Sequence, residues 1–270
     1  DSRHVCDPEV IAGRFRFNGK DWRYALLYLG CDAERSTHNQ IGVAFANSLD
    51  GPWTRYPEPV VRYTSDESGG VVGEFLGWPV YRYWGVGQPA AVSLDRAGQL
   101  LLFMSVGERV WGEETAEVDL SDMDRGPIVG PRKKIPLSGL RGRSKEAPVN
   151  IGNIGVALDE RRDRLYMIRE DLPPRDGLFP DFIGEYSQIA AASWSSFRRG
   201  QVSWEVLGTV DSGCTGWPRN HNPSFARDPY GRLTDPKALT VGISVAEAFA
   251  TPPPDFRWLW TYRIGLLSFS

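Results

Sequence analysis

The chain has 270 residues, with 34 acidic side chains, 31 Lys or Arg and a formal net charge of −3 at pH 7, a balance that gives no electrostatic reason to bind nucleic acid. Hydrophobic residues are 41% and charged residues 24% of the chain, which excludes a disordered protein, and no apolar run approaches the ~18 residues of a membrane-spanning helix. A chain of this length buries roughly three quarters of its unfolded surface, so we expect one domain over residues 1–270.

The residue types favour β structure. The chain contains 29 Gly and 20 Pro, which interrupt short apolar segments throughout, and no long apolar stripe of helical period is present. It also contains 10 Trp, 10 Tyr and 12 Phe. Flat aromatic rings suit the faces of sugars, while the alternative for any single ring is packing in the core. We therefore predict an all-β protein with short strands.

Four segments in chain order follow one plan, in which a polar residue opens an apolar strand and a turn, a second strand and an alternating third strand follow. The opening strands are expected at residues 6–11, 87–92, 152–157 and 221–225. The strands that follow them are expected at residues 22–29 and 41–48, at 100–105, at 164–169 and 188–193, and at 238–244 and 258–264. Residues 126–147 are basic and rich in Pro and Gly, and we expect an outer strand and a loop there.

This repeat predicts a β-propeller, because four-stranded units joined by turns are the blades of that architecture. A β-sandwich is the alternative, since alternation and turns alone would suit it too. The polar residue before Pro at Asp7, Gln88 and Asn222 recurs in three of the repeats and favours the propeller. A shared Gly-Trp-Pro, with Trp78 before the second repeat and Trp217 before the fourth, favours it as well.

In a β-propeller, the start of each inner strand and the loop between the second and third strands lie at one face, so residues there converge on a central funnel. The strand starts supply Asp7, Gln88, Asn153, His221 and Asn222. The return loops supply His38, Glu108, Glu113, Glu114, Glu247 and Asp255. The third return loop, residues 170–186, is long, as functional loops often are, and it carries Asp171, Asp176, Asp181 and Glu185.

These residue types suit a polyhydroxylated ligand, because amides and carboxylates bind pairs of sugar hydroxyls while indoles cover the C–H face of the ring. The side chains expected to contact such a ligand are His38, Trp78, Trp84, Gln88, Asn153, Trp217, His221 and Asn222. The expected partner is therefore a carbohydrate, with no nucleic acid and no membrane.

Several motifs point to a known architecture. Asp7-Pro8 opens the first inner strand, and YALLYLG, IGVAFANSLDGPW and WGVGQPAAVSLDRAGQLLLFMS follow at residues 24–30, 41–53 and 84–105. These motifs resemble the five-bladed β-propeller glycoside hydrolases of the arabinanase and β-xylosidase group, related to glycoside hydrolase family 43. The resemblance implies five blades, whereas four repeats are readable. A fifth blade would lie within residues 59–84, or the ring has four blades.

The resemblance also implies three carboxylates: an Asp in the first inner strand as general base, a second Asp that tunes the pKa, and a Glu as general acid. Asp7 matches the base, whereas Gln88 and Asn153 (or Asn150) stand where the other blades would carry a carboxylate. For the acid, Glu185 is the first candidate and Glu74 the second. These roles imply an inverting glycoside hydrolase that acts on a pentose- or hexose-containing oligosaccharide or polysaccharide.

Three of these residues also have a purely structural explanation. Asp7 could cap an Asx-type turn before Pro8, Glu185 could be a solvated loop residue, and His221 could be a buried hydrogen-bonding residue. The resemblance implies instead that His221 helps to hold a structural cation or a water in the channel. No other feature indicates a metal, and no cofactor is expected.

Two other functions fit the same residues. A non-catalytic carbohydrate-binding propeller would need neither a second nor a third carboxylate. A non-hydrolytic enzyme on the same scaffold, such as a phosphorylase, lyase or isomerase, would also depart from the hydrolase pattern. A phosphorylase would require an anion site, for which the sequence offers Arg3, Arg14, Arg82 and Arg219.

The cysteines and the first residue bear on the compartment. Cys6, Cys31 and Cys214 are an odd number, so at least one thiol stays unpaired if a disulfide forms, and no CxxC pair indicates a zinc or redox site. The numbering begins at Asp1 without an initiator Met, and on this ground we expect an extracellular or periplasmic protein.

Overall fold

The computed structural model describes most of the chain, largely as antiparallel strands. The described residues are 4–31, 38–63, 71–75, 78–81, 84–107, 111–142, 149, 151–171, 176–180, 183–235, 237–251 and 263–269, with backbone alone at 71–75, 78–81, 111, 263–267 and 269. They belong to two compact units. Unit 1 is Asp1–Ile135 with Pro229–Gly231, and unit 2 is Pro136–Asp228 with Arg232–Ser270. Within the described residues, no helix is long and apolar enough to cross a membrane.

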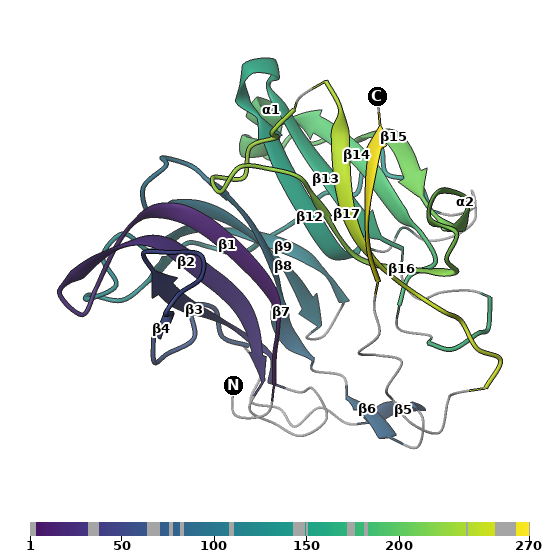
Figure 1. The fold of residues 1–270 in the computed structure, drawn as a ribbon, viewed down its shortest axis with the longest axis horizontal. Helices are drawn as coiled ribbons and strands as arrows, with labels where there is room; N and C mark the ends of the chain where they lie inside the picture. Colours follow the sequence, from purple (N-terminus) through teal and green to yellow (C-terminus); the bar gives the residue numbers. More distant parts are fainter. Residues whose placement is uncertain are drawn as a thin grey trace. The chain divides into compact units, whose positions relative to one another are not determined.

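The first sheet of unit 1 is a meander in which consecutive strands pair (Figure 1, purple to dark blue). Its strands are β1 (His4–Phe17), β2 (Lys20–Cys31), β3 (Gln40–Ala46) and β4 (Thr54–Arg55). Asn18 and Gly19 both have positive φ and join β1 to β2, as a two-residue Asn-Gly hairpin requires. In β2, the buried residues Ala25, Leu27 and Leu29 alternate with more exposed ones, so this strand presents one face to a core.

The second sheet of unit 1 has the order β10-β9-β8-β7, and β11 also pairs with β9. Its strands are β7 (Gly85–Ser93), β8 (Gln99–Gly107), β9 (Trp111–Asp119), β10 (Ile128–Val129) and β11 (Lys133–Lys134). The short strands β10 and β11 lie within the basic segment 126–147, where the sequence predicted an outer strand and a loop. A separate hairpin pairs β5 (Val71–Phe75) with β6 (Trp78–Tyr81).

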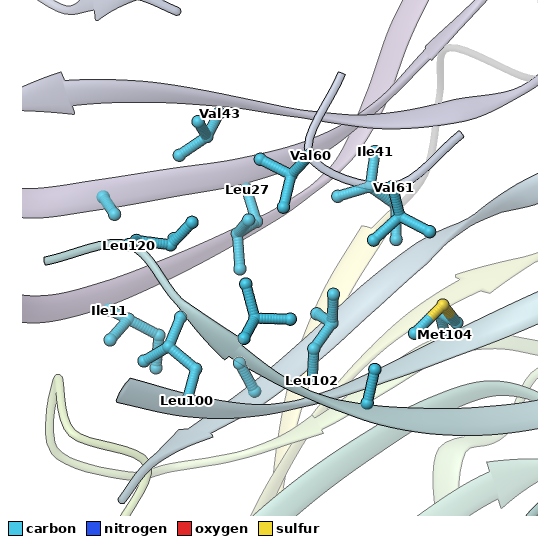
Figure 2. Close-up of a cluster of buried hydrophobic side chains, with 14 of the residues drawn as sticks. Ile11, Leu27, Ile41, Val43, Val60, Val61, Leu100, Leu102, Met104 and Leu120 are labelled. Atoms are coloured by element: carbon cyan, nitrogen blue, oxygen red, sulfur yellow. The ribbon is translucent and has the colours of Figure 1, made fainter. Parts of the chain in front are cut away.

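Aliphatic side chains from both sheets of unit 1 form one core cluster (Figure 2). Leu27 and Val43 come from the first sheet, and Leu102 and Met104 come from the second. Each fully buried side chain of this kind stabilises the folded state by roughly 1.5–3 kcal/mol. The shared core therefore holds the two sheets together as one unit.

Unit 2 contains two further meanders. The first consists of β12 (Gly152–Asp159), β13 (Arg164–Glu170), β14 (Ser187–Ser193) and β15 (Glu205–Val210), and the second of β16 (Arg219–Phe225), β17 (Leu239–Ala246) and β18 (Arg263–Phe269). The helical turns η1 (Glu160–Arg162), α1 (Trp194–Arg198) and α2 (Ser212–Thr215) lie between strands. The core of unit 2 combines residues from both sheets, among them Ala157, Ile168, Ile189, Phe225 and Ile243.

The all-β prediction is confirmed. The four predicted repeats are the four larger sheets, and their predicted opening strands lie in β1, β7, β12 and β16. No disulfide joins Cys6, Cys31 and Cys214, all of which are described; Cys31 is buried and the other two are exposed.

Candidate functional site

The opening strand of each of the four sheets contains the same irregularity. The pairing register shifts between Cys6 and Glu9 in β1, and at the equivalent points of β7, β12 and β16. At each bulge one non-glycine residue has a positive φ: 51° at Asp7, 50° at Gln88, 44° at Asn153 and 47° at Asn222. Asp and Asn are the residues that tolerate this backbone conformation best after Gly. A bulge changes the direction of its side chain, so all four strands present a polar side chain in one special geometry.

Proline follows the left-handed residue in three of the four bulges, as Pro8, Pro89 and Pro223. Proline has no N–H to donate to a sheet ladder, and it is therefore found at bulges rather than within paired strands. The repeated polar-Pro pair that the sequence showed is thus the signature of the bulge. This is the physical reason for the internal repeat.

Two of these bulges lie in unit 1. Asp7 is half-buried, and the Cys6 thiol donates to its Oδ2 at 3.3 Å. Gln88 is also half-buried, and its Oε1 atom is buried with no hydrogen-bond partner among the described residues. Just beyond the bulges, Glu9 Oε1 accepts a hydrogen bond from the Ala91 N–H at 2.9 Å, which ties β1 to β7.

The aromatic and histidine predictions of unit 1 have packing partners. A Cβ atom at Gly87 would lie 2.9 Å from the Trp84 ring and 2.3 Å from the Leu29 side chain, so the indole packs on the backbone of β7. His38 is exposed and stacks on Tyr63, with ring centroids 4.6 Å apart and an interplanar angle of 9°. Asn39, the residue after His38, joins this segment to Trp84, because its backbone N–H and its side-chain Nδ2 both donate to the Trp84 carbonyl.

A buried carboxyl lies two strands from the β7 bulge. Glu113 of β9 is 4% exposed and pairs in register with Ser105 of β8, whose hydroxyl donates to Glu113 Oε1 at 2.5 Å. Its Oε2 atom has no partner among the described residues. Burial raises the pKa of Glu113 well above its ordinary value, and the Ser105 hydrogen bond opposes this only in part. The environment therefore favours the neutral carboxylic acid.

Unit 2 brings together four polar residues from three strands. Glu170, the last residue of β13, is fully buried. Its carboxylate accepts from the backbone N–H of Asn222 at 2.5 Å and of Gly184 at 3.3 Å. His221 Nδ1 lies 2.9 Å from Glu170 Oε1, and the side-chain amide of Asn153 lies 3.3 Å from the same nitrogen. Two predicted ligand contacts, His221 and Asn222, are thus held by one buried carboxylate, and a third, Asn153, contacts His221.

The long loop after β13 is organised by a buried arginine. Arg219 of β16 binds both carboxylate oxygens of Asp176, at 2.7 and 2.9 Å, and its guanidinium also donates to the carbonyls of Leu178 and Pro180. These hydrogen bonds lower the pKa of Asp176. Since Arg219 is fully buried and paired in this way, it does not offer an anion site.

Glu185, the first candidate for the acid, closes this loop. It is 8% exposed, so it is not the solvated loop residue of the alternative explanation. Its Oε1 accepts from the Asp176 N–H at 2.9 Å, and its carbonyl accepts from Asn220 Nδ2 at 2.8 Å. The Glu185 carboxylate therefore helps to fix the loop, whatever else it does.

The structure describes the remaining predicted residues only in part. Glu74 and Trp78 lie in the β5–β6 hairpin, where only the backbone is described, and Arg3 and Arg82 lie outside the described residues. Trp217 is half-buried and packs against the core of unit 2. Among the described residues, no three His, Cys, Asp or Glu side chains are grouped as metal ligands would be.

Sequence reasoning missed Glu170. The signal available was an acidic residue at the end of RLYMIRE, a segment otherwise typical of a buried strand. A carboxylate at that position must find donors within the fold. The donors come from β16 and from Gly184, and their proximity depends on tertiary packing.

Neither the models of protein families nor the curated proteins contain a match to this chain. Solved structures do match it. The catalytic domain of a family 62 α-L-arabinofuranosidase from Coprinopsis cinerea has 12% sequence identity and a TM-score of 0.56, with 98% of this chain and 73% of that chain covered. An α-L-arabinanase from Cellvibrio cellulosa, complexed with arabinohexaose, has 14% identity and a TM-score of 0.52, with 98% and 73% covered. An α-L-arabinofuranosidase from Podospora anserina, complexed with cellotriose, has 11% identity and a TM-score of 0.52, with 98% and 73% covered.

At these identities the similarity concerns the fold alone. The matched structures are five-bladed β-propeller glycoside hydrolases. The fold predicted from the repeats and motifs, an all-β propeller of this group, is therefore confirmed, and the β-sandwich alternative is wrong.

Proposed function

We propose that this protein is a glycoside hydrolase that cleaves a pentose- or hexose-containing oligosaccharide or polysaccharide with inversion at the anomeric carbon. The observation that carries the proposal is Asp7, a half-buried carboxylate at the first of the four repeated bulges. The fold supports it, since two of the matched structures hold cellotriose and arabinohexaose. Fold similarity does not by itself establish function, so the proposal rests on the residues of the bulges.

Inverting hydrolysis needs one carboxylate as general base and one acid. We assign the base to Asp7, which would take a proton from the water that attacks the anomeric carbon. As the glycosidic bond breaks, its electron pair remains on the leaving oxygen, which receives a proton from the acid. The products are a sugar of inverted configuration and an alcohol. Glu185 and Glu74 are the sequence candidates for the acid.

The amides at the bulges support a sugar ligand. Gln88 and Asn153 each keep one amide atom buried without a partner among the described residues. Buried polar atoms are almost always hydrogen-bonded in folded proteins. The hydroxyls of a sugar both donate and accept, and would satisfy such atoms.

The same amides favour a second candidate function, a carbohydrate-binding propeller without catalysis. Gln88 and Asn153 stand where the resembled enzymes carry further carboxylates, and an amide cannot transfer a proton as a carboxyl can. Binding would then use Gln88, Asn153 and the neighbouring polar residues, with no chemical step.

The test is an activity screen by mass spectrometry with oligosaccharides and aryl glycosides of pentoses and hexoses. Wild type, Asp7→Asn, Glu185→Gln and Glu74→Gln are compared, with Asp50→Asn, at an exposed turn, as the matched control. We expect product from wild type and Asp50→Asn, and a loss of roughly 100-fold or more in Asp7→Asn. Proton NMR of the first-formed anomer tests inversion.

Two results would contradict the proposal. If wild type forms no product from any substrate but is thermally stabilised by a sugar, the protein is the binding module. If Asp7→Asn retains full activity, Asp7 is not the base, and the role of the first bulge is structural.

A further inference from the structure

We propose that unit 1 carries a second saccharide-binding site, a pocket on the face of the first sheet that is turned away from the core. The pocket is lined by residues of β2 and β3 and by residues 55–59, which end β4 and follow it. The inference takes its ligand class from the proposed function. It does not require hydrolysis, and it holds equally for a carbohydrate-binding propeller.

The floor of the pocket comes from two paired strands. Tyr28 pairs in register with Gly42, and Gly30 pairs with Gln40. Along β3, Gln40 and Gly42 alternate with residues of the core cluster such as Ile41. Successive side chains of a strand point to opposite faces, so this row faces away from the core. Its two glycines carry no side chain, and the sheet is therefore hollowed at this point.

The Tyr28 side chain supplies an aromatic ring and a hydroxyl. A Cβ atom at Gly42 would lie 2.6 Å from Tyr28 Cζ, so the ring lies directly over the glycine. Burial raises the pKa of Tyr28, and the Arg55 guanidinium, which is hydrogen-bonded to the phenol, opposes this only in part. The phenol therefore stays neutral at pH 7. A neutral tyrosine can contact the C–H face of a sugar and hydrogen-bond to its hydroxyls.

Residues 56–59 form a wall that is fixed to the sheet at both ends. The Tyr56 N–H donates to the Val43 carbonyl at 2.9 Å, and the Val60 N–H donates to the Ile41 carbonyl at 2.7 Å. Two of the residues between these contacts are prolines, whose φ is restricted. A wall held in this way loses little conformational freedom when a ligand binds, which favours affinity.

The charges of the pocket fit a neutral polyhydroxylated ligand. Arg55 offers N–H donors, and Glu58, which is paired with Arg62, offers carboxylate acceptors. Gln40 offers both a donor and an acceptor. Donors and acceptors in one pocket can bind neighbouring hydroxyls of a sugar ring. An anion would be repelled by Glu58 and a cation by Arg55, so neither charged class is favoured.

The pocket adjoins the first bulge within the same sheet. In the pairing register of β1 and β2, Asp7 and Pro8 together stand opposite Tyr28. Neighbouring strands lie about 5 Å apart, so one oligosaccharide is long enough to contact both the pocket and the bulge. The pocket would then hold sugars next to those bound at Asp7.

Nitrogen-15 correlation NMR of the full chain measures this binding residue by residue. Arabinohexaose, xylohexaose and cellohexaose are titrated separately into Asp7→Asn, which should not hydrolyse them, and the end points are compared with wild type. We expect the amide signals of Gly30, Gly42 and Arg55 to shift with at least one hexasaccharide and to saturate with a Kd on the order of 1 mM. Sorbitol, an acyclic polyol at the same hydroxyl concentration, is the control and should leave these signals in place.

Gly42→Ala tests the geometry of the pocket. The added Cβ displaces the Tyr28 ring, and we expect the Kd to rise roughly 10-fold or more. Gly112→Ala in β9 is the matched control, because a Cβ atom there would meet no described neighbour within 4 Å. If Gly42→Ala does not fold, Arg55→Ala replaces it, and its Kd should rise roughly 5-fold or more.

Three results would overturn the inference. The pocket signals stay in place with all three hexasaccharides at about 50 mM, they shift equally with sorbitol, or the Kd is unchanged in the folded pocket variant. Saturable shifts at the pocket of a protein that forms no product in the activity screen would defeat the proposed hydrolysis alone. Product in that screen, together with pocket signals that do not move, would defeat only this inference.

Discussion

Glu113 of unit 1 and Glu170 of unit 2 are both buried, and their carboxyl groups are supported differently. Glu113 of unit 1 receives one hydrogen bond, from the Ser105 hydroxyl, and its Oε2 has no partner among the described residues. Glu170 of unit 2 receives backbone N–H donors from Asn222 and Gly184 and contacts the His221 ring. Burial alone therefore does not determine what a carboxyl can do. The number of N–H donors around it decides whether the fold favours a neutral acid or uses a charge to hold other groups.

The largest expected effect comes from removing the supported carboxylate. Glu170→Ala removes a fully buried carboxylate from three donors, the N–H groups of Asn222 and Gly184 and the His221 ring, and we expect a loss of about 3 kcal/mol or more in the free energy of unfolding. Urea denaturation measures this loss. Glu205→Ala is the control, because Glu205 is 61% exposed and pairs with Arg164 at the surface. That change should cost less than about 1 kcal/mol. A similar cost for both variants would show that the donors around Glu170 do not stabilise the fold.

The Glu113 carboxyl, which has a single hydrogen-bond donor among the described residues, should make the free energy of unfolding depend on pH. The folded-state pKa of Glu113 is raised, so its protonated form is favoured by folding. Below the unfolded pKa of about 4.3, both states are protonated and no penalty arises. As the pH rises from there towards the folded pKa, the unfolded chain ionises first and stability falls, with a slope of at most about 1.4 kcal/mol per pH unit.

Glu113→Gln removes this titration. We expect its stability relative to wild type to increase with pH above about 4.3, as measured by urea denaturation across the pH range. Glu117→Gln, an exposed glutamate in the same strand, is the matched control and should follow wild type. A relative stability of Glu113→Gln that does not change with pH would mean that Glu113 titrates alike in both states.

Removing the Ser105 hydroxyl, the donor to Glu113, should have a smaller effect on the free energy of unfolding. Ser105→Ala removes a hydrogen bond that opposes the rise in the Glu113 pKa. We expect a loss of about 1 kcal/mol in the free energy of unfolding and an extension of the sloping pH region to higher values. A sloping pH region that stays as in wild type would show that the Ser105 hydroxyl does not act on Glu113.

The smallest effect concerns the bulge that lies nearest to Glu113 in sequence. Gln88 has a φ of 50°, a conformation that Asn adopts more readily than Gln. Gln88→Asn should therefore stabilise the protein by a few tenths of a kcal/mol in thermal or urea unfolding. Gln99→Asn at the start of β8, an extended position, is the control and should destabilise slightly. Equal effects at the two positions would show that the bulge carries no backbone strain.

Much of the local structure could be read directly from particular residues. Asn18-Gly19 fixes a two-residue hairpin, and the polar residue before Pro8, Pro89 and Pro223 marks three of the four bulges. The same residues supplied Asp7, Gln88 and Asn222 as site candidates. Asn153 is the fourth bulge residue, but no Pro follows it, so only the spacing of the repeats identified it.

The roles of the loop residues could not be read in this way. Glu185 was singled out from its place at the end of the long loop, but its contacts with Asp176 and Asn220 depend on how that loop closes on β16. The sequence offered Arg219 as one of four arginines for the anion site of a phosphorylase. The structure instead buries it against Asp176, a partner 43 residues away.

The sequence by itself determined the strand pattern, the repeated bulges and the polar residues that they present, because these depend on alternation, proline and backbone preferences within a few residues. The tertiary structure decided which of those residues act together. Glu170 meets His221 and Asn222, which lie about 50 residues later in the chain, only because β13 and β16 pack in one unit. Burial and the count of donors around a carboxyl are properties of that packing, and they set the difference between Glu113 and Glu170.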